Sequence, residues 1–263
     1  MHGSYAANKT ADECDLMFSI GCRFNDRVTG EIKKFAPNAK IVHIDIESAA
    51  ISRNVTVDIP IVADAKAAIL KIEHTEPMEH KEWLDEIQGW DKEYPLQMEV
   101  KDGVNPQRII ETLNEVYADR DTVFTSDVGQ HQMWASQYLK LDATHRLVQS
   151  GGLGTMGFGL PSAVGAQIGC PEKSIVSISG DGGFQMNMQE LATAVCQELP
   201  LVNIVFNNNR LGMVRQMQEL FFKKRYTITC LRYHKSCKGK CGTPGWVCPE
   251  YVPDFVKMAE AYG

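Results

Sequence analysis

Short apolar runs alternate with helix-like stretches in the first part of the chain. Three runs, DLMFSIG, KIVHIDI and IPIVAD, occupy residues 15–21, 40–46 and 59–64, and the helical pattern AKAAILKI follows at 65–72. Apolar runs of this length, separated by turn or helix signals, are typical of parallel strands in an open sheet. We therefore expect residues 1–75 to form one α/β region.

A second set of apolar runs begins after residue 104. Its predicted strands are DTVFTS, HRLVQS, KSIVSIS and LVNIVF, at residues 121–126, 145–150, 173–179 and 201–206. Asn105 and Pro106 provide an N-cap and a first helical residue for a helix through NPQRIIETLNEVYA, and MNMQELATAVCQEL (186–199) predicts another helix. This alternation predicts an α/β fold of open parallel sheets with helices on both faces.

The stretch between the two regions is polar. Residues 76–103 carry many charges together with Pro77 and Pro95, which predicts a linker with one short helix around Lys81 to Trp90. The chain thus divides into residues 1–75, a linker at 76–103, and residues 104–263.

Composition and charge exclude several classes of partner. A formal net charge of -6 argues against a protein that binds the phosphate backbone of nucleic acids, and the basic clusters at 223–225 and 235–240 are short enough to be solvated faces. No apolar run approaches the length of about 18 residues that suggests a membrane span. The N-terminus lacks a signal-peptide pattern, so we expect a cytoplasmic protein without a disulfide framework.

The eight cysteines fall into two groups. Cys14, Cys22, Cys170 and Cys196 lie in apolar surroundings and are predicted to be buried thiols. Cys230, Cys237, Cys241 and Cys248 lie with His234 in the segment 230–248, and such ligands can hold zinc tetrahedrally. Their spacings of seven, four and seven positions differ from the C-x2-C pattern, which favours a flexible loop with free thiols over a zinc site.

The sequence SGDGG after the strand at 173–179 combines features of a phosphate site and of a metal site. Gly180, Gly182 and Gly183 let main-chain N–H groups approach a phosphate at a helix N-terminus, but Asp181 would repel a bare phosphate. A Mg²⁺ ion held by Asp181 and bridging to a diphosphate removes this conflict. The next strand ends at Asn207-Asn208-Asn209, whose amide oxygens can serve the same ion at the same sheet edge. The alternative is a tight turn and an ordinary asparagine-rich loop.

These motifs resemble a known family. A GDG sequence followed after the next strand by NN resembles the thiamine diphosphate motif. TSDVGQHQMWASQY, SGGLGTMGFGLPSAVGA and LGMVRQMQELF are similar to the large catalytic subunit of acetolactate synthase (acetohydroxyacid synthase), as are MHGSYAAN, GCRFNDRVTG and KIVHIDIESAAISRN. The resemblance covers nearly the whole chain except residues 76–103 and the cysteine-rich insertion 230–248. It implies a thiamine diphosphate-binding fold at 104–263 and, at 1–75, the second half of a Rossmann-like, FAD-binding middle domain.

The resemblance also implies roles for individual residues of the second region. Asp181, Asn208 and the main-chain oxygen of Arg210 are the implied Mg²⁺ ligands. The residues implied to contact thiamine diphosphate are Gln130, His131, Gly154, Met156, Gly180, Asp181, Gly182, Gly183 and Asn208. Met156 matches the bulky apolar residue under the thiazolium ring, which bends the cofactor. From the residues alone, His131 is equally well a histidine at a helix start, and Met156 a filler of the core.

Further roles follow for FAD and for the substrate channel. The implied FAD contacts are His2, Gly21, Arg23, Asp45, Ile46 and Asp64. No GxGxxG motif is present, so FAD rests on the resemblance, although an acid after a second strand, like Asp45, is a familiar ribose partner. The implied channel residues are Asp26, Arg27, Met213 and Met217. Arg27 can bind a keto-acid carboxylate, and a surface Asp–Arg pair is the alternative. Met217 stands where the family usually has tryptophan, and Asn25 where it usually has aspartate.

The implied reaction is the decarboxylation of pyruvate and the addition of its two-carbon unit to pyruvate or 2-ketobutyrate, the first common step of branched-chain amino acid biosynthesis. The family assembles as homodimers or larger, often with a small regulatory subunit, and its FAD is structural. Its activating glutamate lies on a domain that no segment here resembles, so we expect this chain alone to lack synthase activity. Another thiamine diphosphate-dependent decarboxylase or carboligase, or a non-catalytic cofactor-binding truncation, is the alternative.

Overall fold

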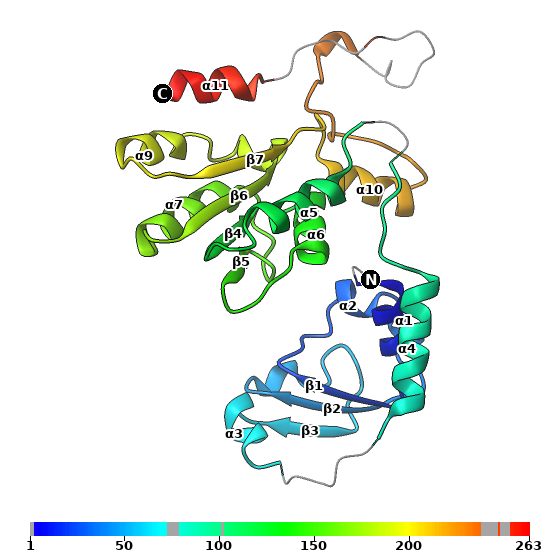
Figure 1. Ribbon diagram of the computed structural model, residues 1–263. Helices are drawn as coiled ribbons and strands as arrows, with labels where there is room; N and C mark the ends of the chain where they lie inside the picture. Colours follow the sequence, from blue (N-terminus) through cyan, green and yellow to red (C-terminus); the bar gives the residue numbers. More distant parts are fainter. Residues whose placement is uncertain (1–2, 73–78, 101–102, 238–246, 248–252) are drawn as a thin grey trace. The chain divides into compact units, whose positions relative to one another are not determined.

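The computed structural model describes residues 3–72, 79–100, 103–237, 247 and 253–263. The chain forms two compact units, Met1–Met98 and Glu99–Gly263, each of which is described by itself (Figure 1).

The first unit contains the three predicted strands in one parallel sheet. The strands β1 (Leu16–Ile20), β2 (Lys40–Asp45) and β3 (Ile59–Val62) lie in the order β1-β2-β3. The helices of this unit are α1 (Tyr5–Glu13), α2 (Asp26–Thr29), α3 (Ala65–Ile69) and α4 (Lys81–Glu93), with 3-10 turns η1 (Ile32–Lys34) and η2 (Ser48–Ala50). A core cluster of Phe24, Phe35, Ala36 and Ile41 closes one side, whereas Leu16, Phe18 and Ile20 of β1 are 40–55% exposed within the described residues.

Helix α4 differs from the short linker helix that the sequence predicts. It runs for 13 residues to Glu93 and lies against α1 (Figure 1). The rings of Tyr5 and Tyr94 are 4.2 Å apart between centroids, and the Lys9 ammonium lies 5.7 Å from the centre of the Trp90 ring. Aromatic contacts with α1 therefore hold this charged segment in the first unit.

The second unit confirms all four strands predicted for it. They are β4 (Thr122–Ser126), β5 (His145–Gln149), β6 (Ser174–Gly180) and β7 (Val202–Phe206), and they form a parallel sheet in the order β5-β4-β6-β7. Helix α5 (Pro106–Val116) starts as predicted: Pro106 is its first residue and the Asn105 side chain accepts a hydrogen bond from the Gln107 N–H. This cap satisfies one of the donors that a helix start leaves free.

Helices cover both faces of this sheet, as the alternation of side chains requires. Phe124, Val176 and Ile178 pack with α5 and α6 (Gln130–Tyr138) on one face. Val123 and Ile175 face α7 (Gly159–Gly169) on the other, where α9 (Glu190–Cys196) and α11 (Phe255–Tyr262) add a further layer. Helix α10 (Gly212–Phe221) follows β7, and η3 (Lys235–Cys237) lies in the insertion. The fold class inferred from the sequence is confirmed.

The segment after β6 is the clearest difference from prediction. The helix expected at 186–199 is shorter than predicted: within that range only α9 is helical, residues 185–189 form turns, and a separate short helix, α8 (Asp181–Phe184), precedes them. The Asn187 side chain donates a hydrogen bond to the Gly157 carbonyl at 2.8 Å. This tertiary contact holds the intervening residues in turns, which helical periodicity could not reveal.

The cysteine predictions were partly wrong. Cys196 is exposed, because it ends α9 while Ala194 takes the inward position, and Cys14, Cys22 and Cys170 are only half-buried. Cys237 is buried. Cys241 and Cys248 lie outside the described residues, so the zinc alternative is not tested; among the described residues, no group of three or more His, Cys, Asp or Glu side chains could hold a metal ion. Within the same residues, no helix is both long and apolar enough to cross a membrane.

Candidate functional site

The carboxyl ends of β4, β6 and β7 bring most of the predicted thiamine diphosphate residues to one edge of the second sheet. Ser126 pairs with Ile178, and Gly180 pairs with Phe206. The chain therefore leaves these strands at Asp127, Asp181 and Asn207, on neighbouring positions of the same edge. Ligands in open α/β sheets bind at this edge.

Asp181 is buried at this edge with part of its carboxylate unsatisfied. The side chain is 3% exposed, and its Oδ1 accepts a hydrogen bond from the Gly182 N–H at 3.0 Å. Its Oδ2 has no hydrogen-bond partner among the described residues. Burial raises the pKa of Asp181 above its ordinary value, although the main-chain N–H groups of Asn209, Gly182 and Arg210 oppose this rise. A buried acceptor without a partner is costly, and a bound cation would satisfy it.

The asparagine loop lies close to Asp181. Asn209 takes a left-handed φ of 58°, which asparagine tolerates well, and the Asn208 Oδ1 accepts a hydrogen bond from the Arg210 N–H at 2.9 Å. Main-chain hydrogen bonds join this loop to the segment 229–231: the Leu211 N–H donates to the Thr229 carbonyl, and the Leu231 N–H donates to the Asn209 carbonyl. The structure thus places the asparagine loop beside Asp181, as predicted. The Asn208 side-chain oxygen accepts a hydrogen bond within this loop.

The glycines of the turn are required by close neighbours. A Cβ atom at Gly180 would lie 2.9 Å from the His131 ring, and one at Gly182 would lie 2.6 Å from Leu211 Cδ2 and 3.8 Å from Met156 Cε. Side chains of the predicted cofactor residues His131 and Met156 therefore lie directly against the GDGG turn. At Gly180 and Gly182 the turn therefore has room for main chain only.

His131 is buried and electrically neutral at this position. The residue is 5% exposed and its Nε2 has no hydrogen-bond partner in the described part of the chain. Burial lowers the pKa of His131 from 6.5 to about 4, against the opposing influence of the Asp127 carboxylate and main chain. The ring therefore presents an unprotonated, hydrogen-bonding edge near neutral pH.

Gln130 connects this edge to α10. Its Nε2 donates a hydrogen bond to the Gln216 Oε1 at 3.2 Å, and its Oε1 lies where a side chain at Gly212 would collide with it. The predicted channel residues Met213 and Met217 lie four positions apart on α10 and so share one face of that helix. Gly154 has a left-handed φ of 74° in the loop before Met156.

Asp127 is a site residue that the sequence reasoning missed. It directly follows β4, is 1% exposed, and accepts hydrogen bonds from the N–H groups of Val128, Gly157 and Gly159. A side chain at Gly183 would collide with the Asp127 carboxylate, whose Cγ lies 2.7 Å from the position of such a Cβ. The signal that could have found it is a charged residue directly after a short run that predicts a buried strand.

Gly183→Ala is expected to destabilise the chain by about 1 to 3 kcal/mol, because the new methyl group is forced into the buried Asp127 side chain. Gly165→Ala is the matched control: Gly165 is an exposed helical glycine of α7 with nothing within 4 Å of an added Cβ. Alanine there should be neutral or stabilising by up to about 1 kcal/mol. Urea denaturation of both variants measures the difference, and equal stability would contradict the proposed packing.

The predicted FAD residues are only partly brought together. Gly21, Arg23 and Asp45 line a cavity of about 600 Å³ in the first unit, with Arg53 and Asn54 among its other residues. Ile46 is 73% exposed, and Asp64 caps α3 by accepting a hydrogen bond from the Ala67 N–H at 2.9 Å; neither lines the cavity. His2 lies outside the described residues.

The predicted channel residues lie on different units. Asp26 and Arg27 are exposed in the first turn of α2, which the Asn25 side chain caps, whereas Met213 and Met217 lie on α10 of the second unit. The structure therefore gives the position of each pair only relative to the other residues of its own unit.

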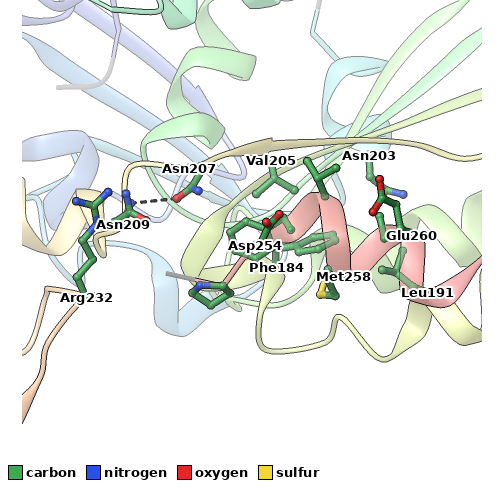
Figure 2. Close-up of a pocket in the computed structure, with 14 residues that line it drawn as sticks. Phe184, Leu191, Asn203, Val205, Asn207, Asn209, Arg232, Asp254, Met258 and Glu260 are labelled. Atoms are coloured by element: carbon green, nitrogen blue, oxygen red, sulfur yellow. Dashed lines mark hydrogen bonds between the residues drawn. The ribbon is translucent and has the colours of Figure 1, made fainter. Parts of the chain in front are cut away.

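A larger pocket lies beside the carboxyl end of β7. Its volume is about 750 Å³, and it is bounded by β7, the start of α9 and α11 (Figure 2). Asn207 and Asn209 reach its rim, where Arg232 lies beside Asn209, but none of the sequence-predicted site residues that the structure describes line it. Its floor is the apolar cluster around Phe184 and Met258. This pocket is distinct from the edge where Asp181, His131 and Met156 meet.

Comparison with known proteins agrees with this site. The profile of the "thiamine pyrophosphate enzyme, C-terminal TPP binding domain" matches residues 127–263, and that of the "thiamine pyrophosphate enzyme, central domain" matches residues 1–72. The chain is 44% identical over 277 residues to the probable acetolactate synthase large subunit of Methanocaldococcus jannaschii, covering 100% of this chain and 43% of that protein.

Two further relatives are similar to the chain to about the same degree and over the whole of its length. It is 41% identical over 281 residues to the probable acetolactate synthase large subunit of Methanococcus aeolicus, and 40% identical over 272 residues to the acetolactate synthase isozyme 3 large subunit of Escherichia coli K12. Each alignment covers 100% of this chain and 44% of the relative, so the chain spans less than half the length of these proteins. With its buried Asp181 at the GDGG turn and a C-terminal TPP binding domain matched over residues 127–263, the chain belongs to the thiamine pyrophosphate enzymes.

Proposed function

We propose that this chain provides the diphosphate- and Mg²⁺-binding part of an acetolactate synthase catalytic subunit. The observation that carries the proposal is the buried Asp181, whose Oδ2 lacks a hydrogen-bond partner among the described residues and which lies beside the Asn207–Arg210 loop. The identity of 40–44% to acetolactate synthase large subunits along the full chain supports the choice of enzyme.

Each residue at the edge has a proposed task. Asp181, Asn208 and the main-chain oxygen of Arg210 would hold Mg²⁺, and Gly180, Gly182 and Gly183 would face the diphosphate. Gln130 and His131 would close over the diphosphate, while Gly154 and Met156 would support the thiamine rings. The close neighbours that leave no room for side chains at the three glycines, and the position of Met156 beside Gly182, support this assignment.

The proposed substrates are 2-keto acids. When bound, thiamine diphosphate would supply the carbon that holds the two-carbon unit left when pyruvate loses CO2, and this unit would be passed to a second pyruvate or to 2-ketobutyrate. Asp26, Arg27, Met213 and Met217 are proposed to border the substrate, with the Arg27 guanidinium binding the keto-acid carboxylate. The methionine at 217 would leave the acceptor more space than a tryptophan. A homodimer or larger assembly in the cytoplasm, with a small regulatory subunit, is the proposed setting.

We assign residues 1–75 to half of an FAD-binding domain and 104–263 to the thiamine diphosphate-binding domain. Residues 76–103 connect the two in sequence, and their helix α4 packs against α1 of the first unit. The cavity at Gly21, Arg23 and Asp45 supports FAD at the first. Arg23→Ala is expected to weaken FAD binding about tenfold, because Arg23 lines this cavity and would offer a positive charge to the FAD diphosphate. Quenching of flavin fluorescence measures this, with Lys66→Ala, on the exposed surface of α3, as the control. Equal quenching by both variants would contradict the assignment.

The enzymatic proposal is tested with a chimera. The region of the Escherichia coli isozyme 3 large subunit that aligns with this chain is replaced by residues 1–263, and acetolactate formed from pyruvate is measured. We expect synthase activity that depends on Mg²⁺ and thiamine diphosphate and disappears with Asp181→Asn. A folded chimera that binds thiamine diphosphate and releases acetaldehyde instead would indicate another decarboxylase. One that binds the cofactor but consumes no pyruvate would indicate a binding module.

A further inference from the structure

Asp127 lies at the point where three segments of the site meet. It follows β4 and precedes the segment of Gln130 and His131, and it is 1% exposed. Because the charge of a carboxylate is rarely buried without specific partners, the contacts of this side chain indicate what it does.

The Asp127 carboxylate holds a loop that is distant in sequence. Its Oδ1 accepts a hydrogen bond from the Gly157 N–H at 3.1 Å, and its Oδ2 accepts one from the Gly159 N–H at 2.8 Å. Gly157 has a left-handed φ of 87°. The two bonds thus fix an unusual main-chain conformation directly after Met156.

The same side chain also limits the GDGG turn. Gly183 packs so closely on the Asp127 carboxylate that no side chain fits between them. Met156 in turn touches the position where a Cβ of Gly182 would be, at 3.8 Å. The loop that carries Met156 and the turn that carries Asp181 therefore both contact the Asp127 carboxylate.

The chemistry of the contacts requires a carboxylate and not merely a polar group. A carboxylate offers acceptors on both oxygens, whereas one end of an asparagine amide only donates. An asparagine at this position would leave either the Gly157 or the Gly159 N–H facing another donor in a buried place. An apolar residue would leave both without an acceptor.

We propose that Asp127 is a positioning residue, whose carboxylate holds the main chain at Gly157 and Gly159 and thereby fixes Met156 against the GDGG turn. The consequence for cofactor binding rests on the proposed function, whereas the positioning itself does not. Asp127 acts through the loop and has no proposed contact with the substrate or the metal.

The first test needs no ligand and uses the whole chain. Methionine methyl groups are labelled with carbon-13, and the Met156 resonance is assigned by its loss in Met156→Leu. In Asp127→Asn we expect the Met156 resonance to shift or broaden while the Met258 resonance stays in place. Asp119→Asn, a change of the same kind at an exposed position, should leave both unchanged.

If Asp127→Asn fails to fold, hydrogen exchange of the unmodified chain still tests the two hydrogen bonds from the Gly157 and Gly159 N–H groups to the Asp127 carboxylate. The amides of Gly157 and Gly159 should exchange at least about 100-fold more slowly than in an unstructured peptide. Exchange at peptide rates would overturn the proposal. So would an unchanged Met156 resonance in a folded Asp127→Asn.

The second test separates positioning of Met156 from a general loss of structure. With Mg²⁺ present, Asp127→Asn should weaken the binding of thiamine diphosphate about tenfold and that of inorganic pyrophosphate less than about threefold, since only thiamine diphosphate carries the rings that Met156 would support. Equal weakening of both probes would overturn the role assigned to Met156. If the unmodified chain bound neither probe, the proposed function would fail, and the methyl and exchange measurements would still decide the role of Asp127.

Discussion

Asp181→Asn is expected to abolish Mg²⁺-dependent binding of thiamine diphosphate and, at the same time, to stabilise the ligand-free chain. The carboxylate is 3% exposed, its Oδ2 has no hydrogen-bond partner among the described residues, and burial raises its pKa. A carboxyl group whose folded pKa is raised stabilises the native state only while it is protonated. That stabilisation is lost as the pH rises through the folded pKa, so above that pKa the buried carboxylate destabilises the ligand-free chain.

A bound Mg²⁺ would offset the cost of burying the Asp181 carboxylate, because the metal would be the partner that Oδ2 lacks. An asparagine retains an oxygen for the Gly182 N–H but carries no charge for the metal. We expect the affinity for thiamine diphosphate with Mg²⁺ to fall at least about 100-fold, which corresponds to about 2.7 kcal/mol. Ligand-free Asp181→Asn should show a higher Tm than the unmodified chain, as is common when a functional charge is removed from a binding site.

Two measurements check this prediction. Isothermal titration with thiamine diphosphate, with and without Mg²⁺, gives the affinity, and thermal unfolding of the ligand-free proteins gives the Tm. Asp119→Asn controls for the loss of one negative charge at an exposed position. Mg²⁺-dependent binding by Asp181→Asn would refute the metal assignment, and a lowered Tm of that ligand-free variant would refute the assigned cost of the buried charge.

The sequence predicted the sheets and the edge of the site because both follow from local patterns. Apolar runs located the seven strands that the described residues form, and the Asn105-Pro106 pair located the start of α5. GDGG and the three asparagines each follow a strand, and parallel strands end at a common edge. Their positions in the sequence were therefore enough to predict that Asp181 lies near the loop of Asn208.

What the sequence could not predict depends on contacts between distant segments. The break between α8 and α9 comes from the bond between Asn187 and the Gly157 carbonyl, and the role of Asp127 comes from the N–H groups of residues 157 and 159. The environment of Cys196 depends on which residue of α9 points inward. The metal and cofactor roles of the individual residues remain predictions, since they concern groups that bind the fold and not the fold itself.

The second large effect concerns His131 and the stability of the chain in acid. Burial lowers the pKa of His131 to about 4 in the native state, whereas an unfolded chain has the ordinary value near 6.5. A histidine whose folded pKa is lowered contributes stability above pH 6.5, and that contribution is lost as the pH falls towards 4, because the unfolded state takes up a proton that the native state does not. Between pH 7 and pH 4.5 this loss amounts to about 2 to 3 kcal/mol.

The groups around the ring explain why it stays neutral. The charged group acting on it is Asp127, whose carboxylate and main chain raise the pKa without overcoming burial, and the Gly129 and Gly180 main chains contact the ring. The His131 Nε2 has no hydrogen-bond partner among the described residues, so the N–H formed by protonation there would have no acceptor. Protonation therefore requires either solvent to enter the site or His131 to leave it.

His131→Gln should remove this part of the acid sensitivity, since glutamine does not titrate. Urea denaturation at pH 7 and pH 4.5 is expected to show a smaller stability difference for His131→Gln, by about 2 to 3 kcal/mol. His145 provides a control of opposite sign: the Tyr117 carbonyl and Asp142 raise its pKa, so its contribution is present below pH 6.5 and is lost at higher pH. His145→Gln should therefore make the chain more sensitive to acid, not less. Equal pH dependence of the unmodified chain and His131→Gln would show that the ring is already solvated in the native state, and the closed contact of His131 with the GDGG turn would then be wrong.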